Sequence, residues 1–367
     1  KEETSSSYSG LHFGHYKAGT ASAYISHFHA LKATLIMHHG VVLKRWAQGL
    51  SLMLQKLYGC SLITKLRSIL LMEADFNATN KIVYGDRMMT NARKYKLIPE
   101  ETFSEKNRMA DDGTLCKTLF YDITRQARVP AAIASVDASN CYDRIAHAIA
   151  SLVFQAFGVP LSASEAMLTT IQEMKFFLRT GFGDSTDFAS STLSIKTQGL
   201  CQGNGASPAG WAVVSICILS AHKKRGHGAH FTCPITKLKS HIAGIIYVDD
   251  TDLVHFRMDE DQGKEDAFFN LQEAITNWGK LLLATGGALK PIKCFFHLIS
   301  FAWKEDGSWF YENNENDEEF QAKVPLADGS FGNIQHLGIN EPIKTLGSMT
   351  CPSGSSRESI EYMQKKG

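Results

Sequence analysis

The chain has 367 residues, of which 44% are hydrophobic and 20% are charged. This length allows about two or three subdomains with a sizeable core, and the composition is that of a soluble globular protein. The longest notable apolar run, WAVVSICILSA, is shorter than the roughly 18 residues of a membrane span, so we expect no transmembrane segment. No signal peptide is visible, and a first residue that is Lys1 rather than Met indicates an excised fragment.

The eight cysteines are scattered singly, without a C-x-x-C pair, and support neither a disulfide framework nor a zinc site. A reduced intracellular setting, the nucleus or the cytoplasm, is therefore expected. The net charge of +1 argues weakly against nucleic-acid binding. Residues 304–323, however, contain seven acidic residues and two lysines, so this segment carries −5 and the rest of the chain +6. The near-neutral net charge therefore does not describe the charge of the surface that would contact a ligand.

In the first third of the chain, a Ser/Gly/His-rich loop precedes a helix that we expect around residues 29–46. A short strand at 67–71 is followed by an amphipathic helix with Ile82 and Val83 on one side. Basic residues in such a region are solvated by default. Arg67 lies among apolar strand residues and is our choice for a phosphate contact.

A strand of small and β-branched residues, 131–136, is predicted to deliver Asp137 at its carboxyl end, and a helix is expected over 142–158. A carboxylate between a strand and a helix is a usual functional position in α/β architecture. The alternative is a helix N-cap role for Asp137, although Ser139 or Asn140 could cap equally well.

Residues 175–197 alternate and turn as expected of a β-hairpin, and the glycine-rich stretch 199–205 follows. Glycine lets the backbone approach a ligand closely. Ser207 and Pro208 mark the N-cap and first turn of a long apolar helix. A glycine loop before a helix is by itself only a weak signal for phosphates or bases.

The stretch HIAGIIYVDDTDLVHF is predicted to form a tight β-hairpin, because one apolar run reaches Asp249 and Asp250 and a second apolar run follows at once. Two adjacent carboxylates on one turn repel each other and attract a cation. An ordinary Asp-rich turn is the alternative explanation.

After this hairpin, an amphipathic helix is expected to end at Gly286 and Gly287, before a basic loop at 290–293 and a strand from Cys294. The acidic, aromatic segment up to Lys323 is predicted to be an exposed hairpin or insertion. Its aromatic side chains are expected to pack under the hairpin rather than to stack on bases. The C-terminal segment is typical of a strand and turn that begin a further helix.

Chemistry that joins phosphate esters needs two Mg²⁺ ions held by carboxylates from separate strands. The sequence offers Asp137 at one strand end and Asp249 with Asp250 at a hairpin, and the glycine-rich loop lies between them in sequence. This order resembles the palm of a reverse transcriptase, specifically of the non-LTR retrotransposon type, over nearly the whole chain.

The resemblance is carried by several motifs in order, each weak alone and specific together. The matching segments, with their departures, are Arg67–Leu71 (R-P-I-x-L-L, Ser68 for proline), Asp137–Asp143 (D-x-x-x-A-F/Y-D, Cys141 for alanine), Gly199–Pro208 (G-x-x-Q-G-x-x-x-S-P), Tyr247–Asp250 (F/Y-x-D-D), Leu289–Lys293 (L-N-P-x-K, Lys290 for asparagine) and Leu346–Gly347 (the L-G of the primer grip). A lysine is common in the family near the position of Asn77.

The resemblance implies an α/β (α+β) fold: a polymerase right hand with fingers, a palm whose antiparallel sheet is flanked by helices, and a partial thumb. The implied domains are fingers with an N-terminal extension (1–130), a palm (131–302, with a fingers-like hairpin at about 175–197), an acidic hairpin insertion (303–342), and the primer grip with the start of the thumb (343–367).

By the same resemblance, Asp137 and Asp249 would ligate both metal ions and Asp250 would complete the triad. The carbonyl of Ala138 would cap the nucleotide-side ion. Lys293 would be the acid that protonates the pyrophosphate leaving group. A solvated loop lysine is the alternative for this last residue.

The nucleotide would contact a second set of residues. Tyr142 would lie beneath the incoming sugar and exclude a 2′-hydroxyl, with a core tyrosine as the alternative. Gln202 and Gly203 would line the nucleotide and template pocket. Lys65 and Arg67 would grip the triphosphate.

The expected activity is RNA-directed DNA polymerisation, a nucleotidyl transfer that extends a DNA or RNA primer with dNTPs on an RNA template, using Mg²⁺ or alternatively Mn²⁺. One rival is a decayed or domesticated nucleic-acid-binding module, which the intact Asp137, Asp249 and Asp250 disfavour. A second rival is an RNA-dependent RNA polymerase, which Tyr142 and the Tyr-Val-Asp-Asp sequence disfavour.

Overall fold

The computed structural model describes residues 7–364, with the exception of residues 57, 61, 63, 64, 193, 259, 260, 315, 316, 346 and 347. The chain forms two compact units, each made of two stretches of sequence. Unit 1 comprises Lys1–Leu97 and Tyr142–Val214, and unit 2 comprises Ile98–Cys141 and Ser215–Gly367. Residues 98–130, which we predicted with the fingers, therefore belong to the same compact unit as the predicted palm strand that follows them.

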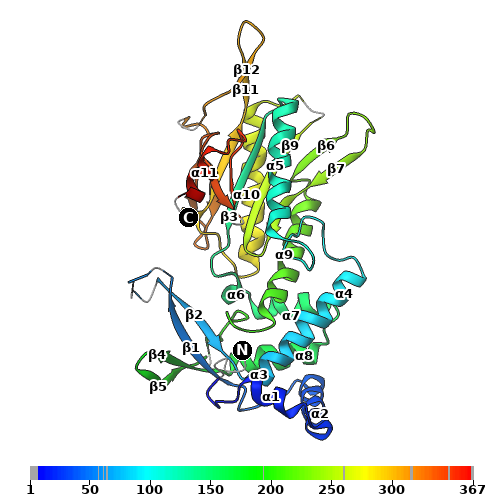
Figure 1. The fold of residues 1–367 in the computed structure, drawn as a ribbon, viewed down its shortest axis with the longest axis vertical. Helices are drawn as coiled ribbons and strands as arrows, with labels where there is room; N and C mark the ends of the chain where they lie inside the picture. Colours follow the sequence, from blue (N-terminus) through cyan, green and yellow to red (C-terminus); the bar gives the residue numbers. More distant parts are fainter. Residues whose placement is uncertain are drawn as a thin grey trace. The chain divides into compact units, whose positions relative to one another are not determined.

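Unit 1 combines a four-stranded sheet with a group of helices (Figure 1). The strand order is β2-β1-β4-β5, with β1 parallel to β4 and the other pairs antiparallel. The elements are α1 (Phe13–Gly19), α2 (Ala23–His39), β1 (Gln48–Gln55), β2 (Leu66–Leu71), α3 (Ala74–Asn80), the π-helix η2 (Lys81–Met88), α4 (Met89–Lys94), α6 (Cys141–Arg144), α7 (His147–Ala156), α8 (Leu161–Gln172), β4 (Lys175–Thr180), β5 (Gly183–Ala189) and the first part of α9 (Ser207–Lys224).

A buried charged network holds the chain before β1 to α3. Asp75 accepts hydrogen bonds from Lys32 Nζ (2.5 Å) and Trp46 Nε1 (3.0 Å), and Arg45 bridges Asp75 and Glu73. Burial alone would raise the pKa of Asp75, but the hydrogen bonds from Lys32 and Arg45 outweigh it and the pKa is lowered. The carboxylate is therefore held ionised and ties α2 to α3.

Unit 2 is built on a mixed sheet of order β15-β10-β3-β9-β6-β7, with β8 also paired to β9 (Figure 1). The central pairs β10–β3 and β3–β9 are antiparallel. The elements are α5 (Ala110–Ala127), β3 (Ala131–Asp137), the remainder of α9, β6 (Ala229–Thr232), β7 (Lys239–Ile242), β8 (Gly244–Tyr247), β9 (Asp250–Arg257), α10 (Lys264–Ala284), the 3₁₀ turn η3 (Pro291–Lys293), β10 (Phe295–Ile299), β11 (Phe301–Trp303), β12 (Trp309–Tyr311), β13 (Lys323–Pro325), β14 (Phe331–Asn333), β15 (Gln335–His336), β16 (Ile343–Thr345), β17 (Ser348–Thr350) and α11 (Arg357–Gln364).

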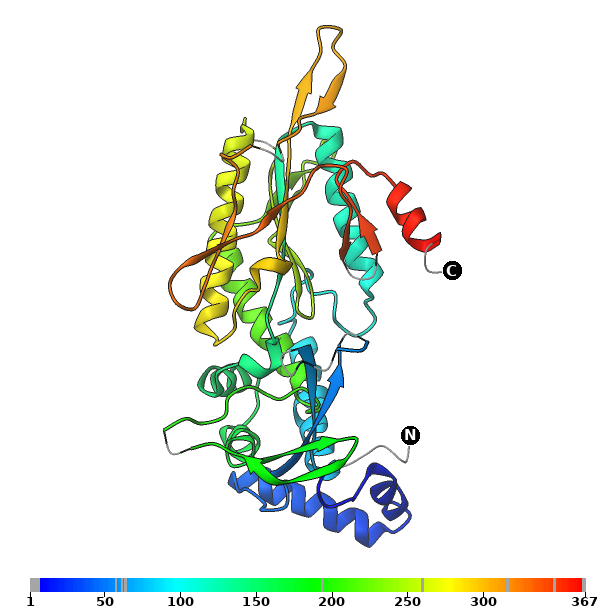
Figure 2. The same cartoon turned by 90° about the vertical axis from the view of Figure 1, so that its left-hand side faces the viewer.

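The core of unit 2 surrounds β3, whose first six residues are all buried. Helix α10 packs against β3, β9 and β10, and α5 lies on the opposite face of the sheet (Figure 2). Phe120 and Tyr121 of α5 pack with Ile133, Val254 and Phe256. A strand covered on both faces requires small or apolar residues at every position, and AAIASV meets this requirement.

The predicted fold class, α/β (α+β) with an antiparallel sheet flanked by helices, is confirmed. The strand at 131–136, the long helix from Ser207 and the hairpin that carries Asp249 and Asp250 all form as predicted. In the described part of the chain, no helix combines the length and the apolar character that crossing a membrane requires.

Three predicted element boundaries were wrong. The helix expected over 142–158 is two helices, α6 and α7, separated by two residues. The helix expected at 29–46 is α2, which ends at His39 because Gly40 adopts the left-handed conformation that terminates helices (φ 66°). The hairpin expected at 175–197 has strands that end at Ala189.

Three buried histidines predict how the stability of unit 2 depends on pH. Burial lowers the pKa of His222 to about 3, of His255 to about 4 and of His297 to about 3. In the unfolded chain each would bind a proton below about pH 6.5. Their contribution to the free energy of unfolding is therefore present above about pH 6.5 and is lost as the pH falls towards 4, by up to about 4 kcal/mol per pH unit.

Denaturant unfolding of the His297→Gln variant measures one of these three contributions. The introduced glutamine side chain stays neutral and can still donate to the Leu337 carbonyl that His297 Nδ1 contacts at 3.1 Å. The slope of stability against pH should fall by about 1.4 kcal/mol per pH unit. The exposed His38 is the matched control, and an equal slope change in His38→Gln would contradict the assignment.

Candidate active site

The three predicted catalytic carboxylates lie at one end of the sheet of unit 2. Asp137 ends β3 and Asp250 begins β9, and the antiparallel register puts these two residues directly opposite each other. Asp249 precedes Asp250 in the two-residue turn between β8 and β9, where Tyr247 pairs with Asp250. Two neighbouring strands and one turn thus bring together the acids that are far apart in the sequence.

The turn is strained at Val248, which has a φ of 58°. A β-branched residue rarely adopts this left-handed conformation, which hairpin turns usually assign to glycine or asparagine. The neighbouring β8 is fixed from its other side, because Ile246 N donates to Glu101 O (3.0 Å) and Phe103 N donates to Ile246 O (2.8 Å). The surrounding hydrogen bonds therefore maintain a strained turn that presents Asp249, as is common at functional sites.

Lys293 supplies positive charge to these acids. Its Nζ lies 2.6 Å from Asp137 Oδ2. The hydrogen bond to Asp137 raises the pKa of Lys293, and the charges of Asp137, Asp249 and Asp250 add to the rise. The contact argues against a simply solvated Lys293, and it directs the Asp137 carboxylate away from a helix-capping role.

The acids are crowded enough to perturb their own ionisation. Partial burial raises the pKa of Asp250 to about 6, and Asp249 and Asp137 add to the rise, although Asp250 keeps contact with solvent. Crowded carboxylates favour a bound cation, and their hard oxygen donors suit Mg²⁺. Among the described residues, no three His, Cys, Asp or Glu side chains are already arranged to hold an ion. The donor set therefore fits Mg²⁺ in its chemistry, with Lys293 as the compensating cation.

A short loop fixes the end of β3 and was only partly visible in the sequence. Lys290 N donates to Asp137 O (3.1 Å), and Ala138 forms a bridge with Leu289. Cys294 Sγ accepts from Asp137 N (3.4 Å) and donates to Lys290 O (3.3 Å). Burial raises the pKa of Cys294 to about 11, so the thiol stays protonated and able to donate. The sequence predicts only a strand from Cys294 and gives no sign of its positioning role.

A hollow of about 310 Å³ opens beside the acids, and its lining includes Asp137, Asp250, Ser135 and Asp252. Ser135 and Asp252 form the next cross-strand pair on the same face of the sheet, and the Ser135 hydroxyl donates to Asp252. Lys117 of α5 lies 3.1 Å from the Asp252 carboxylate, with 1% and 5% of the two side chains exposed.

Removing one member of such a buried ion pair typically lowers the free energy of unfolding by about 3–5 kcal/mol. Because Lys117 contacts both Ser135 of β3 and Asp252 of β9, it fixes these two strands against each other just behind the acids. The sequence contains a signal that we did not use. Asp252 stands among the apolar residues of a buried strand, where a carboxylate requires a cationic partner.

In unit 1, the glycine-rich loop folds against β2 and α6. Gln202 O accepts from Leu70 N (2.8 Å), and Tyr142 O accepts from Leu200 N (2.7 Å). Gly203 has a φ of 118°, and a Cβ there would lie 2.2 Å from Leu70 O, so glycine is required. Backbone contacts therefore bring the predicted nucleotide-binding residues Tyr142, Gln202 and Gly203 together.

Two asparagines of α3 hold this loop and were missed as functional residues. Asn77 Nδ2 donates to Gly203 O (3.1 Å), and Asn77 Oδ1 accepts from Gly205 N. Asn80 Nδ2 donates to Asn204 Oδ1 (3.0 Å). In the sequence, Asn77 stands out only as a departure from the family's lysine. The available signal was two asparagines three residues apart on one helix, where asparagine is otherwise unfavourable.

The remaining predicted residues are less constrained. Lys65 and Arg67 are exposed in unit 1, and neither has an ion pair among the described residues. Arg67 lies on β2 opposite Leu54. Leu346 and Gly347, predicted for the primer grip, lie outside the described residues. The phosphate contacts of Lys65 and Arg67 stay predictions.

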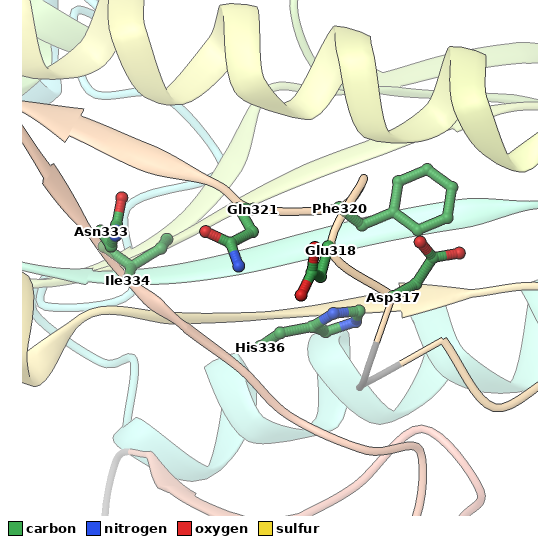
Figure 3. Close-up of a pocket in the computed structure, with 7 residues that line it drawn as sticks. All are labelled: Asp317, Glu318, Phe320, Gln321, Asn333, Ile334 and His336. Carbon is green, nitrogen blue, oxygen red and sulfur yellow. The ribbon is translucent and has the colours of Figure 1, made fainter.

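A second hollow, of about 380 Å³, lies in the C-terminal part of unit 2. Figure 3 shows its lining residues, which are Asp317, Glu318, Phe320, Gln321, Asn333, Ile334 and His336. His336 stacks on Phe296, with ring centroids 4.3 Å apart, so its ring is held by packing. Asp317 and Glu318 make this hollow unsuited to a phosphate.

Replacement of Asn77 by alanine tests the role of this residue in holding the loop. The variant leaves Gly203 O and Gly205 N without their side-chain partner, so the free energy of unfolding should fall by about 1–3 kcal/mol in denaturant titration. Thr79→Ala is the control on the same helix, because among the described residues its hydroxyl bonds only the Asp75 carbonyl of that helix. Equal losses in the two variants would argue against a specific role for Asn77.

No protein-family model and no curated protein matches the sequence. Among solved structures, the chain is similar to apo telomerase from Candida tropicalis truncated from its C-terminal domain, with a TM-score of 0.43 and 13% identity over 84% of this chain and 60% of that one. It is also similar to telomerase from Candida albicans in complex with the TWJ fragment of telomeric RNA, with a TM-score of 0.45 and 11% identity over 88% of this chain and 49% of that one. The chain thus spans about half to three fifths of the length of these two proteins.

Proposed function

We propose that this chain is the core of an RNA-directed DNA polymerase of the non-LTR retrotransposon type. The observation that carries the proposal is the direct pairing of Asp137 with Asp250, with Asp249 in a strained turn beside them and Lys293 against Asp137. Unit 2 would contain the palm, and the assignment of β2 and the glycine-rich loop to the incoming nucleotide follows from their sequence motifs. The right-hand assignment of fingers, palm and thumb is part of this proposal.

Asp137, Asp249, Asp250 and the carbonyl of Ala138 would hold two Mg²⁺ ions, which supply activation of the primer 3′-hydroxyl and neutralise the triphosphate. The protein contributes the positions of these oxygens. The β3–β9 register fixes Asp137 against Asp250, and Cys294 fixes the backbone N–H of Asp137 itself.

Lys293 is suited to deliver a proton to the departing pyrophosphate. Its contact with Asp137 raises its pKa, so the ammonium group is protonated at neutral pH, as a general acid must be. The side chain is 57% exposed, so the ion pair is weak enough to exchange when a charged substrate enters.

Tyr142 is the second residue of α6 and lies five residues after Asp137, and we assign it to the sugar of the incoming nucleotide. By the motif they occupy, Gln202 and Gly203 would approach the base and template; the contacts of this loop with Leu70 hold its backbone in place. Lys65, which immediately precedes β2, and Arg67, on β2, are exposed and would contact the triphosphate.

Primer extension tests the proposal directly. The native chain should extend an annealed primer on an RNA template with Mg²⁺ and dNTPs, and Asp249→Asn should lower the rate at least 100-fold, equivalent to about 2.7 kcal/mol in the transition state. Asp187→Asn, at an exposed site on β5, is the charge-matched control and should retain activity.

A different outcome is that the native chain and Asp249→Asn bind the primer–template equally and neither extends it. This outcome would favour a nucleic-acid-binding module. A longer chain assayed in parallel separates this outcome from an incomplete thumb. Equal extension by the native chain and Asp249→Asn would reject the assigned metal-binding acids.

Replacing Tyr142 by alanine tests the sugar assignment. Loss of the ring should raise ribonucleotide incorporation relative to deoxynucleotide incorporation by about tenfold or more, corresponding to about 1.4 kcal/mol of lost discrimination. Tyr142→Phe retains the ring and should retain the discrimination. A ratio of kcat/KM values for the two nucleotides that is unchanged in Tyr142→Ala would make Tyr142 a packing residue only.

A further inference from the structure

The β6–β7 hairpin and the chain leading into it form an acid-free basic segment. Residues 222–248 contain no Asp or Glu and five Lys or Arg residues, namely Lys223, Lys224, Arg225, Lys237 and Lys239. Lys223 forms an ion pair with Glu101, whereas the other four are exposed and have no ion pair among the described residues. A cluster of one sign without acidic neighbours in sequence is the pattern of a polyanion contact.

The hairpin lines a hollow of about 390 Å³. The cross-strand pairs are His230 with His241 and Thr232 with Lys239, so their side chains share one face of the hairpin. The lining residues are His230, Phe231, Thr232, Lys239, Ser240, Arg257 and Met258. Lys239 and the Thr232 hydroxyl share this face, and Arg257 also lines the hollow; lysine, arginine and hydroxyl groups are those that proteins commonly use for phosphate oxygens.

The base of the hairpin is rigid. The Arg257 guanidinium donates to Gly228 O (2.6 Å) and Gly226 O (2.9 Å). A Cβ at Gly228 would lie 2.5 Å from the Ile242 carbonyl, so the chain before β6 is packed tightly under β7. The rings of His230 and His241 stack with centroids 4.1 Å apart. The hollow is therefore formed before any ligand binds, which limits the entropy lost on binding.

The hairpin is remote from the catalytic acids within unit 2. Strand β9 begins at Asp250 and ends at Arg257, and β6 pairs only with the far end of β9, at Phe256 and Arg257. Seven residues of strand separate Asp250 from Arg257 by roughly 23 Å. This is about seven phosphates along one nucleic-acid strand.

We infer that the β6–β7 hairpin is a second nucleic-acid contact, which binds the phosphodiester backbone of an RNA or DNA strand through Lys237, Lys239 and the hollow beside Arg257. The contact is independent of the polymerase reaction: it requires no metal ion, no dNTP and no catalytic carboxylate. The hairpin would recognise the phosphate groups of the strand and not its base sequence.

The test compares the double variant Lys237→Asn/Lys239→Gln with the charge-matched control Lys280→Gln/Lys304→Gln, whose lysines are exposed elsewhere in unit 2. Asn is chosen at 237 because Lys237 has a φ of 59°, which asparagine tolerates. Fluorescence anisotropy without Mg²⁺ or dNTPs measures binding of a single-stranded RNA and of a duplex DNA over a range of salt concentrations. Thermal unfolding of each variant verifies that it is folded.

A plot of log K against log salt has a negative slope. Loss of two phosphate contacts should reduce the magnitude of this slope by about 1.4 for single-stranded RNA or about 1.8 for duplex DNA, with no change in the control. The nucleic acid whose slope falls identifies the strand that the hairpin contacts. Slopes equal to those of the control with both nucleic acids would overturn the inference. Because catalysis plays no part in this assay, its result is separate from the primer-extension outcome.

Discussion

The antiparallel pairing of β3 with β9 is the constraint on which the rest of unit 2 depends, because it sets like charges opposite each other. Asp137 faces Asp250 across the pair, and such a pairing is unfavourable unless cations compensate it. Two lysines supply this compensation on the same face of the sheet. Lys293 contacts Asp137, and Lys117 contacts Asp252, which lies two cross-strand pairs further along.

The two lysines differ in exposure, and this difference separates their roles. Lys117 is 1% exposed, so its ion pair with Asp252 is a permanent part of the fold. Lys293 is 57% exposed, and exposed pairs of this kind contribute only about 0–1 kcal/mol. A site that must accept both metal ions and a charged substrate needs two kinds of ion pair. One pair is permanent and fixes the strands, and the other, at the acids, is exchangeable.

Charge is also divided along the sequence of unit 2, although the chain as a whole is almost neutral. Residues 304–323 carry −5, whereas residues 222–248 carry +5 with histidines counted as neutral. The acidic segment follows β11, which forms a separate two-stranded sheet with β12, whereas the basic segment surrounds β6 and β7 of the large sheet. A nucleic acid would therefore meet strongly different potentials over one unit, which net charge alone does not reveal.

The sequence by itself determined the features that are local in the chain: the buried strand before Asp137, the tight hairpin at Asp249 and Asp250, and the helix after the glycine-rich loop. Periodicity and turn residues specify these features within about ten positions. Only the tertiary structure decided the partners of the site, because hydrogen bonds and ion pairs join residues far apart in sequence. Lys117 and Asp252 are 135 residues apart, and Asn77 lies 128 residues from Gly205. Their pairing depends on which strands and helices meet in the fold, and no local pattern records that choice.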